Sequence, residues 1–182
     1  MQLKTIFNRV TNYKPFVVER VELTENGPPT IEITMRPREN GLPTCSDCGK
    51  RCSGYDMQPT PRRFDFVPLW MIPVVLVYTM RRVNCPTCGV KVERVPWSEG
   101  KSPLTTAYKW FLAGWARRMS WKEVSMCFAV SWDHVYNSVE HAVSWGLSHR
   151  DLDEIDLHRL ADSPGEVGHE IHAALQHPDE DR

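Results

Sequence analysis

Four of the six cysteines in this 182-residue chain occur in two Cys-x-x-Cys-Gly motifs. Cys45 and Cys48 lie in TCSDCG, and Cys85 and Cys88 lie in NCPTCG. The two-residue gap places both sulfurs of a pair on the inside of a tight turn, where Pro86 presets the backbone and the glycine permits a close approach. Two such turns can present four thiolates to one ion, the tetrahedral donor set of a closed site. We therefore predict that these four cysteines bind a structural Zn²⁺.

Other assignments of the cysteines stay open at this point. Paired Cys-x-x-Cys motifs in a cytosolic chain favour metal binding over disulfides. Iron in a rubredoxin-like centre is an alternative to zinc, and four buried cysteines without metal are another. Cys52, four residues after Cys48, is predicted to be a spare thiol, and Cys127 lies in an apolar helical pattern that predicts a core position.

The composition is that of a chain with a buried core and no membrane segment. Apolar residues make up 41% of the sequence, and no run reaches the roughly 18 apolar residues that a spanning helix needs. The N-terminal segment MQLKTIFNRV lacks the apolar run and cleavage site of a secretory signal. We therefore expect a cytoplasmic protein with no membrane partner.

Charge is distributed unevenly, although the formal net charge is only −1. Between Lys50 and Lys122 there are 13 Lys or Arg against 4 Asp or Glu, whereas from Asp151 to Arg182 there are 2 against 10. A basic region is typical of proteins that bind phosphate backbones, and an acidic end poor in aromatics is typical of disordered tails. Solvated surface is the alternative explanation for both regions.

Strands are predicted to position the cysteines. The two pairs are 36 residues apart, more than the about 15–20 of a minimal ribbon, so a hairpin must be inserted. The segment RRFDFVPLWMIPVVLVYTMRRVNC supplies it, and its second half predicts a strand that runs into the second pair. Upstream, alternating residues from Phe16 to Leu23, the turn ENGPP and a strand from Thr30 to Met35 predict a hairpin that extends the ribbon.

Downstream of VPW, residues 95–97, the pattern becomes helical. A first helix is predicted from Ser102 to Arg118, with apolar residues at spacings of three and four. SWKE at residues 120–123 is a capping box that opens a short second helix, and Ser131 caps a third. This order is a helix-turn-helix pattern, for which an ordinary three-helix bundle is the alternative.

In a helix-turn-helix, the start of the second helix enters the major groove, so its exposed residues are predicted to contact DNA. Asn can bind adenine through two hydrogen bonds, and Arg and Lys contact phosphates. Tyr136 is one candidate. The other predicted contacts are Arg62, Arg63, Arg81, Arg82, Arg117, Arg118, Lys122, Ser131, Trp132, Asp133, His134 and Asn137.

These motifs together resemble the N-terminal half of the bacterial "ISL-three" family of insertion-sequence transposases. The resemblance is carried by RRFDFVPL, RRVNCPTCGVKVERVPW, FLAGWARRMSWKEV, SWDHVYNSVEHAVSWGL and HRDL, which cover most of residues 13–152. It implies that this half binds the element's terminal inverted repeats and that its zinc ligands are Cys45, Cys48, Cys85 and Cys88. It also implies a DDE catalytic core on an RNase H-like fold, in which three carboxylates hold two Mg²⁺.

The segment HRDLDEIDLHRL, residues 149–160, departs from that family pattern. The family's catalytic region begins with Gly-x-Asp-Glu-Ile after a linker, whereas here the acidic residues follow HRDL at once. The roughly 30 residues that remain are too few for a mixed catalytic sheet of more than about 100 residues. We therefore expect a truncated transposase without the DDE core and without a Mg²⁺ site.

The sequence thus predicts an α+β fold in four segments. Residues 1–40 form an N-terminal β-hairpin, residues 41–98 a four-cysteine zinc ribbon, residues 99–150 a three-helix helix-turn-helix module, and residues 151–182 an acidic, disordered tail. The predicted function is zinc-dependent, sequence-specific binding of double-stranded DNA at transposon ends, without enzymatic activity. Full-length transposase or a second copy of the chain is a further expected partner, in the nucleoid.

Two other functions remain open from the sequence. An active transposase subunit would have Asp153 contribute to a catalytic site that is completed in trans. A zinc-ribbon module for protein contacts would bind another protein in place of DNA.

Overall fold

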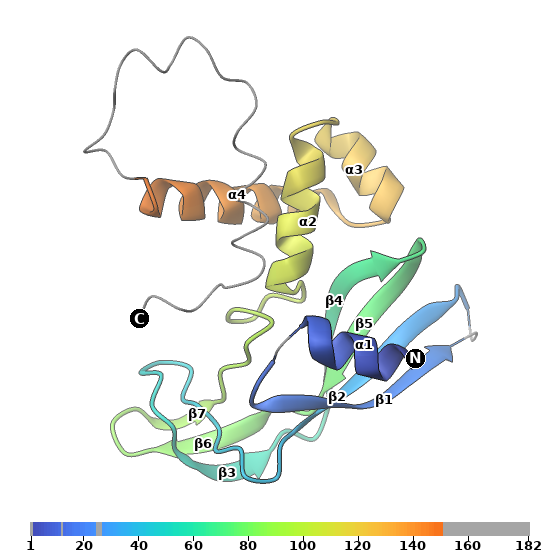
Figure 1. Cartoon of the computed structure of the whole chain (residues 1–182). Coiled ribbons are helices and arrows are strands. Elements are labelled where there is room, and N and C mark those ends of the chain that lie inside the picture. Colours follow the sequence, from blue (N-terminus) through green and yellow to red (C-terminus); the bar gives the residue numbers. More distant parts are fainter. Residues whose placement is uncertain (1, 12, 25–26, 151–182) are drawn as a thin grey trace. The chain divides into compact units, whose positions relative to one another are not determined.

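The computed structural model describes residues 2–11, 13–24 and 27–150. The expected acidic tail, with Asp153, lies outside the described residues. Within the described ranges the order is one helix, seven strands and three helices (Figure 1). The chain divides into two compact units, Met1–Tyr108 and Lys109–Arg182. This mixed α+β content agrees with the predicted fold class.

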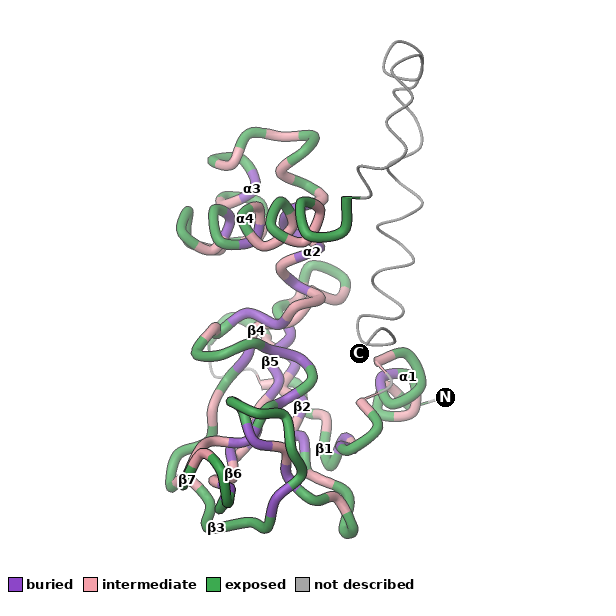
Figure 2. Tube along the Cα trace, turned by 90° about the vertical axis from the view of Figure 1, so that its left-hand side faces the viewer, coloured by how far each residue is buried: buried purple, intermediate pink, exposed green. Residues whose placement is uncertain are grey.

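A four-stranded mixed sheet makes up much of the first unit. Its order is β1-β2-β5-β4, in which β2 and β5 are parallel and the other neighbours are antiparallel (Figure 1). On β2, alternate residues are buried, whereas β5 buries Val74, Val75 and Leu76 in succession, as a strand covered on both faces does (Figure 2). The strands are β1 Phe16–Thr24, β2 Thr30–Pro37, β4 Arg62–Leu69 and β5 Ile72–Tyr78.

The pairing of β2 with β5 changes the expected organisation. The sequence predicts separate segments at 1–40 and 41–98, but Ile31–Thr34 of β2 lie beside Val74–Val77 of β5. The inserted hairpin therefore completes the N-terminal sheet and does not extend the cysteine-bearing one. Parallel pairing of strands that are distant in sequence leaves no local signature, so the pattern of each hairpin alone does not predict it.

A smaller antiparallel sheet carries the second cysteine pair. Its order is β3-β6-β7, with bounds Ser53–Met57, Arg81–Cys85 and Gly89–Val92. The prediction of a single strand that runs into this pair is wrong. Strand β5 ends at Tyr78 in the four-stranded sheet, and β6 begins at Arg81 in the three-stranded sheet. Met80, in the connection, is buried in the same core as Tyr78. The chain therefore changes sheet while its apolar residues remain buried.

Helix α1, Leu3–Val10, is not predicted by the sequence pattern. Its buried residue Phe7 contacts the rings of Phe66 and Tyr13, with centroid distances of 5.3 and 6.4 Å. Asn8 Oδ1 accepts a hydrogen bond from the backbone N–H of Val18 at 3.0 Å. The helix has no side-chain N-cap and no acidic first turn, so packing against the sheet stabilises it more than its own propensity does.

Trp97, the last residue of VPW, is central to the core of the first unit. Only 1% of it is exposed, and its ring meets those of Phe16, Tyr78 and Phe64 edge to face at 4.8, 5.4 and 6.0 Å. Such geometry is favourable for aromatic pairs. The segment that follows the cysteine-bearing sheet is thus packed against the four-stranded sheet.

Helix α2, Thr106–Ala116, begins later than predicted. Thr105 Oγ1 accepts a hydrogen bond from the backbone N–H of Tyr108 at 3.2 Å, so Thr105 caps the helix in place of Ser102. The backbone N–H and the hydroxyl of Thr105 both donate to the carbonyl of Asp65 at 2.9 Å. The first turn of α2 is therefore attached to strand β4.

Helices α3, Trp121–Phe128, and α4, Trp132–Ser148, begin at the predicted caps. The backbone N–H of Glu123 donates to Ser120 Oγ at 3.3 Å, and Glu123 Oε2 accepts from the Ser120 N–H at 2.8 Å, which completes the capping box. The backbone N–H of His134 donates to Ser131 Oγ at 3.2 Å. Both predicted caps are confirmed.

A tight turn joins α3 to α4 in the second unit. Ala129 ends α3 in the left-handed conformation, with φ of 52°. Val124 of α3 and Val135 of α4 are fully buried, and the two helices contact each other. None of the helices in the described ranges is both long enough and apolar enough to cross a lipid bilayer.

Candidate metal centre and nucleic-acid interface

The structure brings the four predicted cysteines together. The sulfur atoms of Cys45, Cys48, Cys85 and Cys88 all lie within 4.8 Å of one another, and those of Cys48 and Cys85 are 3.5 Å apart. A tetrahedral ion with Zn–S bonds of about 2.3 Å requires sulfurs about 3.8 Å apart. Four close thiol groups and no other donor type fit zinc, so this cluster could hold one metal ion.

Turns at the ends of short strands position these sulfurs. Cys85 ends β6, and Cys88 lies in the turn before β7, where Gly89 has a φ of 75° that strains other residues. The first pair lies in a similar turn, closed by a bridge between Thr44 and Arg51. A second bridge pairs Cys45 with Glu93, the residue after β7. Backbone contacts therefore hold the two turns together.

Hydrogen bonds favour a thiolate at Cys85. The backbone N–H groups of Cys88 and Thr87 donate to its sulfur and lower the pKa of Cys85 to about 6. The pKa of the Cys88 thiol is raised by its hydrogen bond with Cys48, by desolvation and by its hydrogen bond with Cys85. One thiolate at neutral pH gives a metal ion an anionic first ligand.

The two remaining cysteines lie in different environments. Cys52 is buried beside the cluster and its thiol donates to the Lys50 carbonyl at 3.4 Å, while burial raises its pKa. A neutral thiol suits the spare role predicted for Cys52. The core position predicted for Cys127 is wrong, because that residue is exposed on α3. The eight-residue helix turns Val124 inward, and the apolar pattern around Cys127 does not specify which face is covered.

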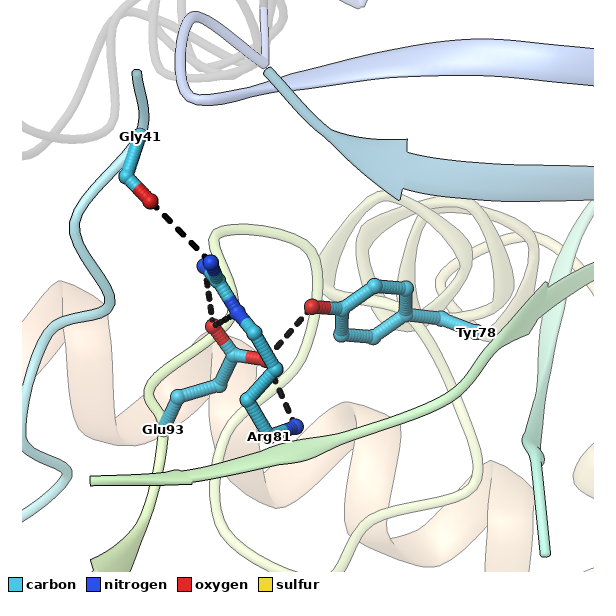
Figure 3. A network of polar contacts seen from close by, with 4 residues as sticks. All are labelled: Gly41, Tyr78, Arg81 and Glu93. Atoms are coloured by element: carbon cyan, nitrogen blue, oxygen red, sulfur yellow. Dashed lines mark hydrogen bonds and ion pairs between the residues drawn. The ribbon is translucent and has the colours of Figure 1, made fainter. Parts of the chain in front are cut away.

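A buried polar network links the cysteine loops to the four-stranded sheet (Figure 3). Glu93, 3% exposed, accepts hydrogen bonds from Arg81 Nε at 2.9 Å and from the Tyr78 hydroxyl at 2.5 Å. Arg81 also donates to the carbonyl of Gly41, in the loop before the first cysteine pair, at 3.0 Å. Desolvation and the bond to Glu93 raise the pKa of the Tyr78 hydroxyl. The network joins three segments that the sequence does not place together.

The four arginines predicted on the first unit have partners within the chain. Arg81 is engaged in the network. Arg63 and Arg82 form ion pairs with Glu32 and Asp56. Arg62 donates to the carbonyls of Gly100 and Ser102 and lies over the ring of Phe64 at 4.7 Å. The exposed ion pairs of Arg63 and Arg82 contribute little to stability, whereas breaking the buried Arg81 pair is costly.

The residues predicted on the second unit are mostly at its surface. Arg117, Arg118 and Lys122 are exposed, as are Trp132, Asp133 and Asn137 at the start of α4, whereas His134 is half-buried and Ser131 is the N-cap. Trp121 joins Trp132 and Tyr136 in an aromatic cluster that the sequence pattern does not predict. The rings of Trp132 and Tyr136 stack with their centroids 5.8 Å apart. Their four-residue spacing on one helix could have predicted this contact, because residues i and i+4 lie on the same helix face.

Comparison with known proteins agrees with the sequence motifs. Over 160 residues the chain is 26% identical to the transposase for insertion sequence element IS1557 of Mycobacterium tuberculosis, in both strain CDC 1551 / Oshkosh and strain ATCC 25618 / H37Rv. The chain is related to an insertion-sequence transposase. The match covers 80% of this chain, and the chain spans only 36% of the length of those relatives. The predicted transposase resemblance is thereby confirmed, while the "ISL-three" subdivision stays a prediction.

Two other comparisons gave no match for this transposase-related chain. No family model matches it. No solved structure matches it either. The assignment therefore depends on the curated relatives and on the residues described above.

Proposed function

We propose that this transposase-related protein binds the terminal inverted repeats of a transposable element, in a zinc-dependent and sequence-specific manner. The observation that carries the proposal is the pair α3–α4, in which two capped helices and a tight turn leave the start of α4 exposed. The relatives are named as transposases, and proteins of that kind must recognise the ends of their element. A helix-turn-helix provides such recognition through the first turns of its second helix.

The exposed face of α4 supplies the groups for reading bases. Asn137 and Asp133 are four residues apart, so they lie on the same helix face and both reach outward. An Asn amide can donate to and accept from adenine, and an Asp carboxylate can accept from the amino group of cytosine. Trp132 adds an exposed aromatic ring beside them. This combination supports direct contact with base edges in the major groove.

Basic side chains near α3 supply phosphate contacts. Arg117, Arg118 and Lys122 are exposed and come just before or at the start of α3. In helix-turn-helix proteins the first helix of the motif crosses the DNA backbone, where such cations position the protein. Arg62, Arg63 and Arg82 extend this role to the first unit. Arg81 is left out, because its guanidinium already binds Glu93 and Gly41.

The metal has a structural role in this proposal. A zinc ion held by the four thiolates would fix the loops that carry Cys45 and Glu93, and Glu93 connects those loops to Tyr78 of β5. Strand β4, which pairs with β5, holds Thr105 and thus the first turn of α2. Four protein ligands leave no open position on the ion, so the site is suited to support the fold and not to catalyse a reaction.

Selection from random DNA tests this function. The zinc-loaded protein would be mixed with random-sequence duplexes, and bound molecules would be recovered and sequenced over several rounds. We expect enrichment of one motif, with binding that weakens steeply as salt rises because phosphate contacts release counterions. Recovery of no motif, together with no band shift at low salt, would overturn the proposal in favour of a protein-binding module.

Substitution of Asn137 should separate specificity from affinity. We expect Asn137→Ala to weaken binding to the selected motif by about 5-fold to 150-fold, the loss of one base contact, and to relax preference at one position. Lys122→Ala should weaken binding to all sequences and reduce the salt slope by about 1. Equilibrium titrations at several salt concentrations measure both effects. Identical behaviour of the two variants would contradict the assigned roles.

A further inference from the structure

The tip of the β4–β5 hairpin has an unusual backbone and an unusual composition. Leu69 pairs with Ile72, so Trp70 and Met71 alone form the two-residue turn. Both have positive φ, 52° and 65°, which is the type I′ geometry that normally takes Asn-Gly. Large side chains at such positions strain the backbone, and strain of this kind often marks a functional position.

The side chains at this tip are exposed to solvent. Trp70 is 80% and Met71 is 72% exposed, although Met is often fully buried and Trp is highly buried on average. Ordinary selection for stability would favour polar residues or glycine here, since these relieve the strain and remove apolar surface from water. The tip therefore has a cost in stability that binding to a partner would offset.

The two strands that end at the tip carry no charged residue next to it. From Phe66 to Met80 the chain has no charged residue. On β4, Asp65 lies four residues before Leu69, and Arg62 lies seven residues before it, which is roughly 23 Å along a strand. The tip is therefore an apolar surface, and the charged residues of β4 lie further back on the strand.

The small apolar area of the tip favours DNA over protein as the partner. A tryptophan buries about 150–250 Å², and a stable protein interface needs about 800 Å² on each side, so two side chains are too few even with the exposed Leu23 of β1. Insertion between stacked bases requires only one or two apolar side chains, and Met is among those that DNA-bending proteins insert. An exposed indole also stacks on bases of any sequence.

We propose that Trp70 and Met71 form a wedge that enters a base step of duplex DNA and unstacks it. This inference rests on the proposed function and adds to it the kind of DNA that is bound, a duplex opened at one step beside the recognised motif. A two-stranded ribbon is narrow enough to enter a DNA groove. Unstacking near the end of an element would prepare the strands there for a later reaction.

The test uses the duplex recovered by selection, with 2-aminopurine placed at each adenine in turn. This base becomes fluorescent when it leaves the stack. We expect the full-length wild-type protein to raise the fluorescence at one position. The double substitution Trp70→Asn and Met71→Gly should abolish that rise and weaken binding by about 5-fold to 150-fold, the contribution of one stacked base. The salt slope should not change, because no charge is removed.

The double variant is expected to fold, so a loss of unstacking cannot be attributed to unfolding. Asn-Gly is the preferred type I′ pair, so the variant should unfold at a higher temperature than the wild type. Val10→Ser, which removes a 77% exposed apolar side chain from α1, is the matched control and should leave fluorescence and affinity unchanged. Bound DNA with no fluorescence rise at any position would overturn the wedge and leave the proposed function intact. Failure of the wild type to bind any duplex would overturn both.

Two further outcomes would also overturn the wedge. In the first, the variant binds DNA and unstacks it as the wild type does. In the second, the variant changes only the self-association measured by light scattering, which would assign the tip to a contact between protein copies. The wedge is supported only when unstacking and affinity fall together in a well-folded variant.

Discussion

Replacing Cys85 with serine is expected to remove metal binding from this protein. Cys85 receives hydrogen bonds from two backbone N–H groups that hold its thiolate, and its sulfur lies 3.5 Å from that of Cys48. A serine hydroxyl stays protonated at neutral pH and is a poor zinc ligand. Loss of a group that only orients a metal ligand lowers metal affinity by about 10-fold to 100-fold. Loss of the ligand itself should therefore lower metal affinity by more than about 100-fold.

Metal analysis and thermal unfolding measure this effect. The wild type should retain one zinc per chain after dialysis, and elemental analysis also distinguishes zinc from iron. Cys85→Ser should retain none and should unfold at the temperature of the chelator-treated wild type. Cys127→Ser on α3 and Cys52→Ser beside the cluster are the matched controls, and both should keep the metal. Full zinc occupancy in Cys85→Ser, with unchanged affinity, would contradict the assignment of the site.

Glu93→Gln is expected to destabilise the metal-loaded protein by about 3–5 kcal/mol. The Glu93 side chain is 1% exposed and the Arg81 side chain is 16% exposed, so the substitution leaves a largely buried guanidinium without its counter-charge. The Tyr78 hydroxyl and the backbone N–H of Arg81 also lose an ionised acceptor. Because Glu93 joins the cysteine loops to the four-stranded sheet, both parts of the first unit should lose stability together.

Urea unfolding followed by circular dichroism measures the loss. Glu22→Gln removes an exposed ion pair with Arg20 on β1 and should cost about 1 kcal/mol or less. Tyr78→Phe keeps the ion pair and removes one hydrogen bond, so a loss of about 1 kcal/mol is expected even if Glu93→Gln does not fold. An equal, small effect of Glu93→Gln and Glu22→Gln would show that the buried network does not stabilise the fold.

Local signals predicted the cysteine cluster and the starts of two helices correctly. The spacing of the cysteines predicted which four sulfurs meet, because each pair is held by its own turn. The SWKE box and Ser131 predicted the starts of α3 and α4, because capping depends on groups a few residues apart. Cys127 shows the limit of this reasoning, since an apolar pattern on a short helix does not specify which face is covered.

Features that depend on distant contacts could not be predicted in this way. The parallel pairing of β2 with β5 and the hydrogen bonds of Thr105 with Asp65 join residues about 40 positions apart. Arg81 looked like a phosphate ligand because it lies in a basic segment, and only the fold shows that Glu93 and Gly41 already occupy it. The exposed turn at Trp70 could not be predicted, because it lies within an apolar run that is typical of a buried strand.

In the proposed function, a metal ion held by the cysteine cluster supports sequence-specific DNA binding. Fluorescence anisotropy of the selected duplex, titrated with zinc-loaded and with chelator-stripped protein, tests it most directly. We predict that stripping abolishes specific binding and that Zn²⁺ restores it whereas Mg²⁺ does not, since a four-thiolate site selects the softer ion. Equal affinity of the stripped and loaded proteins, with metal loss verified by elemental analysis, would contradict the claim.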